Sequence, residues 1–372
     1  MILLQTPSWI VEAGTSAISS GFTKYVNPSG TTEIKQAIAK HFTKTRGVTI
    51  GMDRVVVGPG AKPGLWFGFQ AIASQGDEIL CPDPGFPSYE NMVKCFGCTA
   101  VKYDALANEV GAELKQHITS KTKAVILNSP SNPTGRVYSQ EDLAKIAGVM
   151  QNYENIWIIS DEIYCHLIYD HDDEVEYPFD YFPTSPSIAV FPNMLDRTIV
   201  VDGFSKTFQM TGWRLGFVIC NPELASKLHL LMTHAIGCTA SFTQVAGIAA
   251  LTNPNAGKAL SDVIKEYKQR RNYVVSRLNA MSGISCETPK GAFYAFADVS
   301  KCGISARELC DKFLNEGFVA ILPGGDFGSK GENFIRISYV GTLETLKEGL
   351  DRMEKVVLSL SSFPSTKKIK LF

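Results

Sequence analysis

The sequence predicts an α/β protein whose main domain holds a largely parallel seven-stranded sheet, followed by a smaller α+β domain. Seven short apolar runs alternate with longer segments between residues 55 and 220. The runs are almost continuously apolar, which is typical of strands covered on both faces. The length of 372 residues exceeds what one hydrophobic core usually supports, so we expect two domains.

The strand candidates follow one another at intervals that leave room for helices. They are VVVGPG at 55, EILCPDPG at 78, TAVKYD at 99, AVILNSPSNPTG at 124, IWIISDEIY at 156, TIVVDGFSK at 198 and LGFVIC at 215. Helical segments between several of them imply right-handed crossovers and therefore parallel neighbours. The last two runs are too close together for such a crossover, so one of them is expected to run antiparallel.

A long helix and a smaller domain are predicted after the sheet. Apolar residues keep helical spacing from Ser261 to Met281, which indicates a helix leading out of the sheet domain. Beyond it, GAFYAFADV and NFIRISYV have the pattern of strands, and ARELCDKFLNEG and LETLKEGLDRMEKVV that of helices. We expect an N-terminal arm over 1–24 that packs with the small domain, a large domain over 25–270 and a small C-terminal domain over 271–372.

Composition and charge exclude several classes of protein. With 45% apolar and 20% charged residues the chain resembles an ordinary folded globular protein. A formal net charge of −1 provides no basic surface for nucleic acid. No run of about 18 apolar residues occurs, and MILLQTPSWI lacks the basic segment of a signal peptide. We expect a cytoplasmic protein without membrane or nucleic-acid partners, and no spacing of cysteines or histidines predicts a metal.

Polar or glycine-rich clusters follow several of the predicted strands. Open parallel sheets bind ligands beyond the carboxyl ends of their strands, so these clusters should converge. The glycines of GPGAKPG precede a helix, whose free amide groups favour a phosphate, although a plain turn is also compatible with them. The other clusters supply an amide, a carboxylate, a phenol and two cations: Asn132, Asp161, Tyr164, Lys206 and Arg214.

Each of these residues alone has an ordinary explanation as a turn, a helix cap or an internal ion pair. A buried carboxylate such as Asp161 must nevertheless meet a cation or have its pKa raised. A lysine between two core segments, such as Lys206, also loses hydration that another interaction must replace. One ligand with a phosphate, a basic ring nitrogen and an aldehyde could bind at all of these residues, and pyridoxal phosphate is such a ligand.

Five motifs give the chain a resemblance to a known family. SKTFQMTGWRLG, NSPSNPTG, SDEIY, YVNPSGTTEIKQAIAKHF and NFIRISY together resemble the class I/II aminotransferases of pyridoxal phosphate fold type I, the aspartate aminotransferase-like family. The resemblance extends from about Thr6 to the C-terminus. It implies a homodimeric enzyme with shared active sites that moves an amino group between an L-amino acid and a 2-oxo acid by a ping-pong mechanism. An aspartate-type donor is slightly favoured.

The resemblance implies catalytic roles around the cofactor ring. Lys206 would bind the cofactor aldehyde as a Schiff base and later move the substrate proton. Asp161 would pair with the ring nitrogen and keep it protonated. Asn132 and Tyr164 would donate hydrogen bonds to the ring oxygen. Phe86 would stack on the ring; Tyr89 is the alternative for that position, and core packing is the ordinary explanation for both aromatic residues.

Binding roles are implied in the same way. Arg214 would bind the cofactor phosphate with its two guanidinium nitrogens, and Tyr25 would reach that phosphate from the neighbouring subunit. Arg336, with Asn132, would bind the substrate α-carboxylate. Further phosphate donors would be Gly60, Ala61, Lys62 and Ser205. Lys62 would alternatively contact the distal carboxylate of an acidic substrate, although a phosphate-side or surface role is the favoured reading.

The chain departs from the family in two places. Only about 24 residues precede Tyr25, where most members have a further loop over the substrate; part of the substrate lid is therefore expected to be missing or supplied differently. Gly203 stands where other members have a serine, so one phosphate donor is expected to be absent.

Three other functions are alternatives to this expectation. A carbon–sulfur β-lyase on the same scaffold differs only in the fate of the substrate carbanion. A non-catalytic regulator that binds the cofactor would be expected to carry a DNA-binding extension or to lack the lysine. A nicotinamide-dependent dehydrogenase would need a glycine fingerprint that the sequence lacks.

Overall fold

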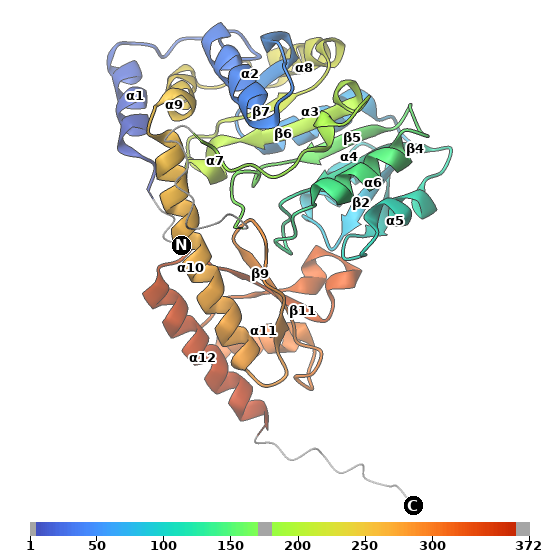
Figure 1. Ribbon diagram of the computed structural model, residues 1–372, viewed down its shortest axis with the longest axis vertical. Helices are drawn as coiled ribbons and strands as arrows, with labels where there is room; N and C mark the ends of the chain where they lie inside the picture. Colours follow the sequence, from blue (N-terminus) through green and yellow to red (C-terminus); the bar gives the residue numbers. More distant parts are fainter. Residues whose placement is uncertain (1–4, 170–180, 362–372) are drawn as a thin grey trace, which may run out of the picture.

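The computed structural model describes residues 5–169 and 181–361. These residues form two units, each built on one sheet, and Figure 1 shows helix α10 (Ala256–Ala280) running from the upper unit to the lower one. The larger unit, made of the described residues before α10, contains a seven-stranded sheet, and the smaller unit, made of those after it, a four-stranded sheet. The expected boundary between residues 270 and 271 falls inside this continuous helix, so the domain limits stay a prediction.

The seven-stranded sheet confirms the mainly parallel arrangement expected from the sequence. Its strand order is β1-β7-β6-β5-β4-β2-β3. Strand β7 runs antiparallel to both β6 and β1, as the short connection before it predicted, whereas the pairs from β6 to β3 are parallel. The strands are β1 (Val55–Gly58), β2 (Glu78–Asp83), β3 (Thr99–Asp104), β4 (Thr122–Asn128), β5 (Trp157–Asp161), β6 (Thr198–Gly203) and β7 (Gly216–Ile219).

Both faces of this sheet are covered, which explains the continuous apolar runs. In β4, Ala124 and Ile126 belong to the core on one face, while Val125 and Leu127 belong to the core on the other. The first face packs against α3 (Ala61–Ile72), α4 (Ser88–Cys95) and α8 (Pro222–Ala235). The second packs against α2 (Thr32–Arg46), α5 (Val110–His117), α6 (Gln140–Met150) and α9 (Ser241–Thr252).

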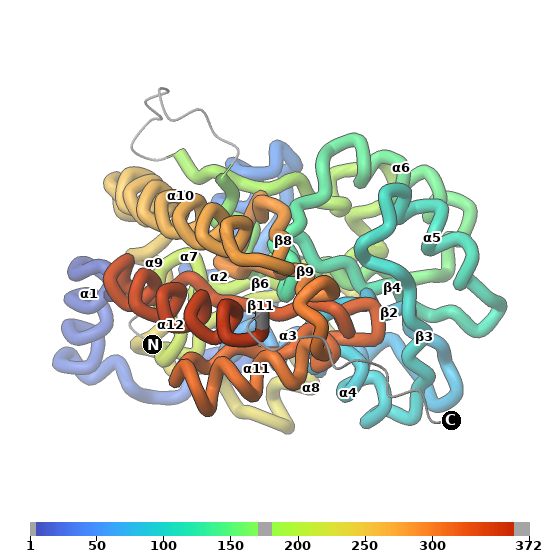
Figure 2. Tube along the Cα trace, turned by 90° about the horizontal axis from the view of Figure 1, so that it is seen from below, coloured from blue at the N-terminus to red at the C-terminus, as the bar shows by residue number. Residues whose placement is uncertain are grey.

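The smaller unit contains an antiparallel sheet in the order β10-β11-β9-β8. Figure 2, seen from below, shows α10, α11 and α12 gathered over β9 and β11. The two strands and two helices predicted after the long helix are all present; β8 and β10 are short additions. The elements are β8 (Ser285–Cys286), β9 (Tyr294–Asp298), α11 (Ala306–Asn315), β10 (Leu322–Pro323), the short helices η4 (Gly324–Phe327) and η5 (Ser329–Gly331), β11 (Phe334–Ser338) and α12 (Leu343–Ser361).

The N-terminal arm requires a correction. Helix α1 (Ser8–Ser19) packs on α9 of the larger unit rather than on the four-stranded sheet. Gly14 permits a close approach to the larger unit, because a Cβ there would lie 2.6 Å from the ring of Trp213, in the loop before β7. Thr6 Oγ1 also donates to the carbonyl of Gln209 at 2.8 Å. The described part of residues 1–24 therefore belongs with the larger unit.

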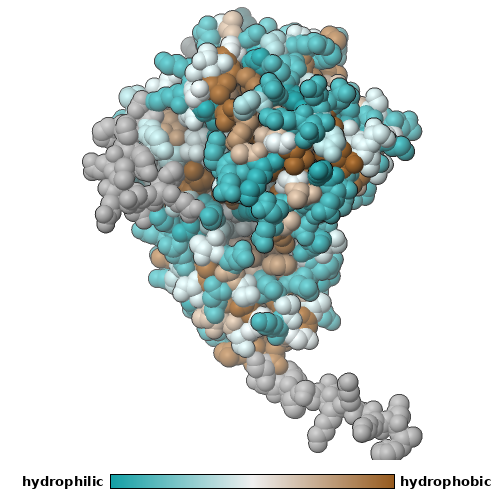
Figure 3. Space-filling model, turned by 45° about the vertical axis from the view of Figure 1, so that its right-hand side comes forward, coloured by the Kyte–Doolittle hydropathy of each residue, from teal (hydrophilic) through white to brown (hydrophobic). Residues whose placement is uncertain are grey.

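The surface agrees with the mixed composition of the chain. Figure 3 shows hydrophilic residues over most of the visible face, with hydrophobic residues in separate patches. Within residues 5–169 and 181–361, no helix is both long enough and apolar enough to span a lipid bilayer.

Candidate active site

A cavity of about 380 Å³ lies beyond the carboxyl ends of β4, β5 and β6. The smaller unit closes one side of it with residues of β9 and β11. Four of the lining side chains are cationic and one is a carboxyl, so the cavity suits an anionic ligand. Its lining residues are Ala61, Lys62, Leu65, Phe86, Tyr89, Asn128, Asn132, Asp161, Ile163, Tyr164, Ser205, Lys206, Thr211, Arg214, Tyr294 and Arg336.

Asp161 is the last residue of β5 and is almost fully buried. Its Oδ2 accepts a hydrogen bond from the hydroxyl of Tyr89 at 2.6 Å. Burial raises the pKa of Asp161 to about 6, and the bond from Tyr89 and the charge of Lys206 oppose that rise. Burial favours the neutral form of this carboxyl. A cation bound beside Asp161 would lower the carboxyl pKa and favour the ionised form.

Lys206 projects into the cavity from α7 (Phe204–Thr207), a single turn that follows β6 directly. Its Nζ lies 5.8 Å from the ring centroid of Tyr164 and 5.5 Å from that of Phe293. Burial lowers the pKa of Lys206, the charge of Arg214 lowers it further, and Asp161 acts in the opposite direction. A lysine amine with a lowered pKa is more often unprotonated and can act as a nucleophile or a base.

An anion cradle forms where Arg214 meets the start of α3. Gly60, at the N-cap, has φ +101°, and a Cβ there would lie 2.4 Å from Arg214 Nη2. Gly216 on β7 is equally confined, because its Cβ would lie 2.4 Å from the carbonyl carbon of Gly60. No side chain caps the first amides of α3, which leaves N–H groups and the helix dipole for an anion. Ser205 and Thr211 line the cavity nearby.

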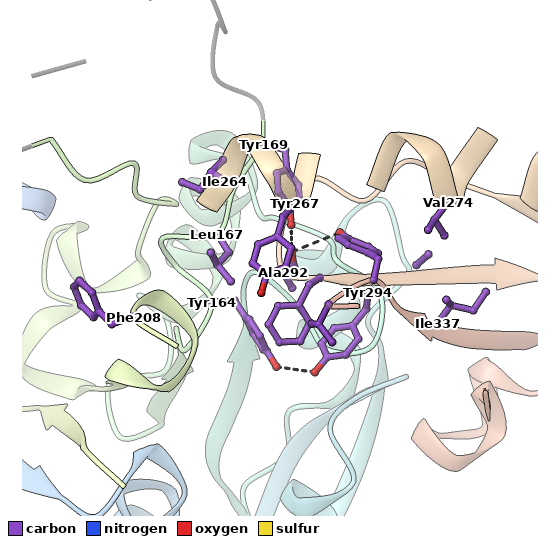
Figure 4. Close-up of a cluster of buried hydrophobic side chains, with 14 of the residues drawn as sticks. Tyr164, Leu167, Tyr169, Phe208, Ile264, Tyr267, Val274, Ala292, Tyr294 and Ile337 are labelled. Carbon is purple, nitrogen blue, oxygen red and sulfur yellow. Dashed lines mark hydrogen bonds between the residues drawn. The ribbon is translucent and has the colours of Figure 1, made fainter. Parts of the chain in front are cut away.

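Tyr164 and Tyr294 bring the two units together at the cavity. Their hydroxyl oxygens are 2.8 Å apart, and Figure 4 shows this bond between the loop after β5 and the first residue of β9. Burial raises the pKa of Tyr164 well above its usual value, and Tyr294 adds to the rise. Both phenols therefore remain neutral hydrogen-bonding groups in this arrangement.

Arg336 on β11 faces the opposite end of the cavity. Its Nη1 donates to Oδ1 of Asn132 at 2.9 Å, so the amide nitrogen of Asn132 remains as a donor. The guanidinium carbon lies 4.5 Å from the ring centroids of both Tyr294 and Phe327. Within the described residues, the buried Nε of Arg336 has no hydrogen-bond partner. A buried guanidinium with an unpaired donor is suited to a carboxylate.

Phe86 and Lys62 line the side of the cavity next to α3. The Phe86 ring packs edge-to-face on Tyr89, with centroids 5.6 Å apart. Lys62 Nζ lies 5.2 Å from the centroid of the Phe86 ring, and Lys62 is otherwise exposed. A cation in this position can reach ligands that extend from the cavity towards solvent.

Ten of the twelve residues singled out in the sequence line this cavity. Gly60 does not line it but leaves space for Arg214. Tyr25 is 91% exposed and lies beside Gly237, outside the cavity of its own chain. The structure therefore does not bring Tyr25 together with the other predicted residues.

Two lining residues of clear importance were not predicted, and a third was given another role. Tyr89, considered for stacking, instead donates to Asp161. Asn128, the last residue of β4, accepts from the amide of Asn132 at 2.9 Å and donates to the carbonyl of Asp161 at 3.0 Å. Its place at the end of a predicted buried strand was a usable signal. Tyr294 lies within an apolar run, and nothing there signalled a site.

The glycine at position 203 has a steric explanation. A Cβ at Gly203 would lie 3.0 Å from Gly216 Cα and 3.1 Å from the carbonyl oxygen of Leu215. Any side chain at this position would therefore be tight against β7, the antiparallel neighbour of β6.

Comparisons with known proteins match the whole of this architecture. The family model described as "Aminotransferase class I and II" matches residues 3–353. The aspartate aminotransferase of Pyrococcus horikoshii is 37% identical over 357 residues, which cover 95% of this chain and 88% of the relative. The aromatic-amino-acid aminotransferase 2 of Thermococcus litoralis is 35% identical with the same coverage. A solved aromatic aminotransferase from Pyrococcus horikoshii matches with a TM-score of 0.89 and 37% identity, over 96% of this chain and 94% of that one.

Proposed function

Because this chain belongs to the class I and II aminotransferase family and is a pyridoxal phosphate-dependent transaminase of fold type I, we propose that the cavity around Lys206 is its active site. In this proposal the enzyme moves an amino group between an L-amino acid and a 2-oxo acid in a ping-pong cycle. The main supporting observation is Lys206, a largely buried amine that lines the same cavity as Arg214 and Asp161 and whose pKa is lowered by burial and by the charge of Arg214. Arg336 faces the same cavity with an unpaired Nε.

The residues at the start of α3 fit the phosphate of the cofactor. Arg214 would bind it with its guanidinium, and Gly60 supports this role because a larger residue would displace the guanidinium. Ser205 and the amides of Ala61 and Lys62 would add donors. Among the described residues, the phosphate would therefore meet one guanidinium cation and several neutral N–H and O–H donors.

The rest of the cavity fits the pyridine ring. Asp161 would pair with the protonated ring nitrogen, and that cation would lower the carboxyl pKa from about 6. Asn132 and Tyr164 would donate to the ring oxygen, Phe86 would cover the ring, and Lys206 would bind the aldehyde. When bound, the cofactor supplies an electron sink for the bond broken at the substrate α-carbon.

The substrate would lie between Lys206 and Arg336. We assign Arg336, together with Asn132, to the α-carboxylate, because Nε is unpaired and the guanidinium is held between two aromatic rings. Lys206 would take the α-proton and return it at another carbon, which its lowered pKa favours. Closure of the site by both units would exclude water from this proton transfer.

An amino acid added without any 2-oxo acid tests this assignment. We expect the purified holoenzyme to form one equivalent of 2-oxo acid per active site and to lose its visible absorbance, then to stop. A β-lyase would instead turn over repeatedly with an amino acid that carries a leaving group. Lys206→Ala should form no product, whereas the exposed Lys121→Ala should behave as the unchanged enzyme. Product formation by Lys206→Ala at the normal rate would refute the role of Lys206.

We propose that the preferred donor is of the aspartate type and that Lys62 contacts its distal carboxylate. Support comes from the position of Lys62 Nζ beside Phe86 at the solvent side of the cavity and from the aspartate aminotransferases among the relatives. Lys62→Ala should lower kcat/KM for aspartate by about tenfold or more, as expected for loss of a charged contact, and leave an aromatic donor nearly unchanged. Equal losses for both donors would assign Lys62 to the phosphate instead.

We also propose a homodimer in which Tyr25 completes the site of the neighbouring subunit. The exposure of Tyr25 outside its own cavity supports this. The cytoplasmic location stays a prediction.

A further inference from the structure

Asp83 binds the smaller unit to the larger one. It is the last residue of β2 and only 3% exposed. Its Oδ2 accepts from the amide and the hydroxyl of Ser329 at 3.1 and 2.8 Å, and its Oδ1 accepts from the amide of Lys330 at 3.0 Å. All three donors lie 246 or 247 residues away in the smaller unit, at the start of η5. A carboxylate that accepts several N–H and O–H bonds makes strong, directional contacts.

The loop of the smaller unit is shaped to receive this carboxylate. Gly328 has φ +132°, a conformation that residues with a side chain rarely adopt. A Cβ at Gly328 would also lie 2.1 Å from Asp83 Oδ1. The carboxylate therefore occupies the space that any other residue at position 328 would need.

This contact leads directly to the side chain that faces the substrate. The amide of Gly85, two residues after Asp83, donates to the carbonyl of Phe327 at 2.8 Å. The Phe327 ring is buried and lies 4.5 Å from the guanidinium carbon of Arg336. Asp83 and Gly85 thus hold both sides of the turn that carries Phe327, and Phe327 covers one face of Arg336.

We propose that Asp83 is a positioning residue for recognition of the substrate α-carboxylate. It anchors the turn at 327–330 to the end of β2, so Phe327 keeps Arg336 aimed at the cavity next to Asn132. Asp83 itself does not line the cavity. The inference rests on the proposed role of Arg336 and goes beyond it, because it assigns the geometry of the binding site to a contact between the two units.

The test is the variant Asp83→Asn in the holoenzyme. The amide NH₂ would face N–H groups, so at least one of the three bonds is lost. KM for α-amino acids should rise about tenfold with kcat changed little, because a misplaced guanidinium weakens binding of the ground state and the transition state alike. Affinity for pyridoxal phosphate should stay unchanged. In the cofactor-free protein, amide hydrogen exchange at Ser329 and Lys330 should become faster.

Gly328→Ala tests the same inference in a second way, because the new Cβ would displace the Asp83 carboxylate while Asp83 itself is unchanged. Its matched control is Gly303→Ala, at a glycine that also has a positive φ, +81°, but no neighbour within 4 Å of the new Cβ. Asp104→Asn removes the ion pair of Asp104 with Lys330 Nζ and keeps an oxygen that can accept from the amide of Leu106. Both controls should keep the normal KM. If Asp83→Asn does not fold, Gly328→Ala and Ser329→Ala carry the test.

Arg336→Lys separates failure of this inference from failure of the proposed function. The two latch variants are Asp83→Asn and Gly328→Ala. If Arg336→Lys raises KM but the latch variants do not, the positioning role of Asp83 is refuted while the role of Arg336 stands. If Arg336→Lys leaves KM unchanged, both assignments fall. A parallel loss of kcat, cofactor affinity and melting temperature in the latch variants would show a general structural role and would also overturn the inference.

Discussion

At the scale of single residues, the chemistry of the cavity rests on burial acting in opposite directions on two groups. Burial raises the pKa of Asp161 and lowers that of Lys206, so the neutral forms of both are favoured. The charge of Lys206 opposes the rise in the pKa of Asp161, and Asp161 opposes the fall in the pKa of Lys206, but burial has the larger effect on both. A ligand with a cationic ring nitrogen would restore the charge of Asp161 while leaving Lys206 available as a nucleophile.

Tyr89 provides a residue-scale prediction. Its hydrogen bond to Asp161 lowers the carboxyl pKa, so Tyr89→Phe should raise that pKa above about 6 in the cofactor-free protein. The carboxyl resonance of Asp161, followed by NMR against pH, measures this directly. In the holoenzyme the acidic limb of the kcat profile should move to higher pH.

The control for Tyr89 is Tyr103→Phe. Tyr103 is equally buried, but its hydroxyl donates to the carbonyl of Ile126 and does not reach the cavity. If Asp161 titrates identically in Tyr89→Phe and in the unchanged protein, the 2.6 Å hydrogen bond from Tyr89 has no effect on the pKa of Asp161.

The sequence identified individual site residues better than their pairings. Asp161 and Lys206 could be predicted as cavity residues, because residue type and a position at or after a strand end carry the signal, and Arg214 could be predicted from the motif that contains it. The bond of Tyr89 to Asp161 spans 72 residues, and that of Arg336 to Asn132 spans 204. Such pairs depend on how distant segments of the chain meet in space, which local patterns do not encode.

At the scale of elements, the hydrophobic pattern was sufficient to predict a helix or strand wherever that element buries a continuous face. All seven strands of the large sheet begin within two residues of the predicted runs, and most of them bury residues on both sides. Strands β8 and β10 have two residues each and no period to detect. The turn around Gly328 was equally unpredictable, since its shape depends on the distant Asp83.

The attachment of α2 to the sheet provides an element-scale prediction about pH. Nε2 of His41, on α2, lies 3.0 Å from Nε2 of His166, which belongs to the loop after β5. Burial lowers the pKa of His166 to about 3 and that of His41 well below its usual value. Arg46, beside them, forms a buried ion pair with Glu162 and further disfavours protonation.

The sign of the effect follows from proton uptake. Between about pH 6.5 and pH 3 the unfolded chain binds a proton at residue 166 that the folded protein excludes. Stability is therefore lost as the pH falls through this range, by up to about 1.4 kcal/mol per pH unit for one proton. His166→Gln should remove the contribution of residue 166. Its free energy of unfolding should therefore fall less steeply with decreasing pH than that of the unchanged protein.

Denaturant unfolding of both proteins at several pH values measures the difference. The nearby Asp202, whose pKa burial raises to about 7, acts in the opposite direction but is present in both proteins. The exposed His234→Gln is the control and should follow the unchanged protein. Parallel curves for His166→Gln and the unchanged protein below pH 6.5 would contradict the prediction.

At the scale of the whole molecule, the site is assembled from parts that are far apart in the chain. The larger unit provides Asp161, Lys206 and Arg214, and the smaller unit provides Tyr294 and Arg336. The two units are connected by the continuous helix α10 and by the contact of Asp83 with η5. A change in their relative position would alter the distance across the cavity between the Arg336 guanidinium and the Lys206 amine.

The proposed dimer leads to a whole-molecule prediction about shared sites. Tyr25→Ala should weaken cofactor binding, and Lys206→Ala should abolish turnover. If Tyr25 acts in the neighbouring subunit, a mixed dimer of the two variants contains one intact site. Random mixing gives half mixed dimers, each with one intact site of two, so activity should return to about a quarter of the normal value.

The measurement is activity at limiting pyridoxal phosphate, after the two inactive variants are unfolded and refolded together. Each variant treated alone is the control and should stay inactive under the same conditions. Recovery requires that the Lys206 of one chain meet the Tyr25 of the other, because no single chain in the mixture carries both. If the mixture regains nothing although mixed dimers form, Tyr25 serves its own chain or no site at all. Each subunit would then have to bind the cofactor phosphate with residues of its own chain, among them Arg214, Ser205 and the start of α3.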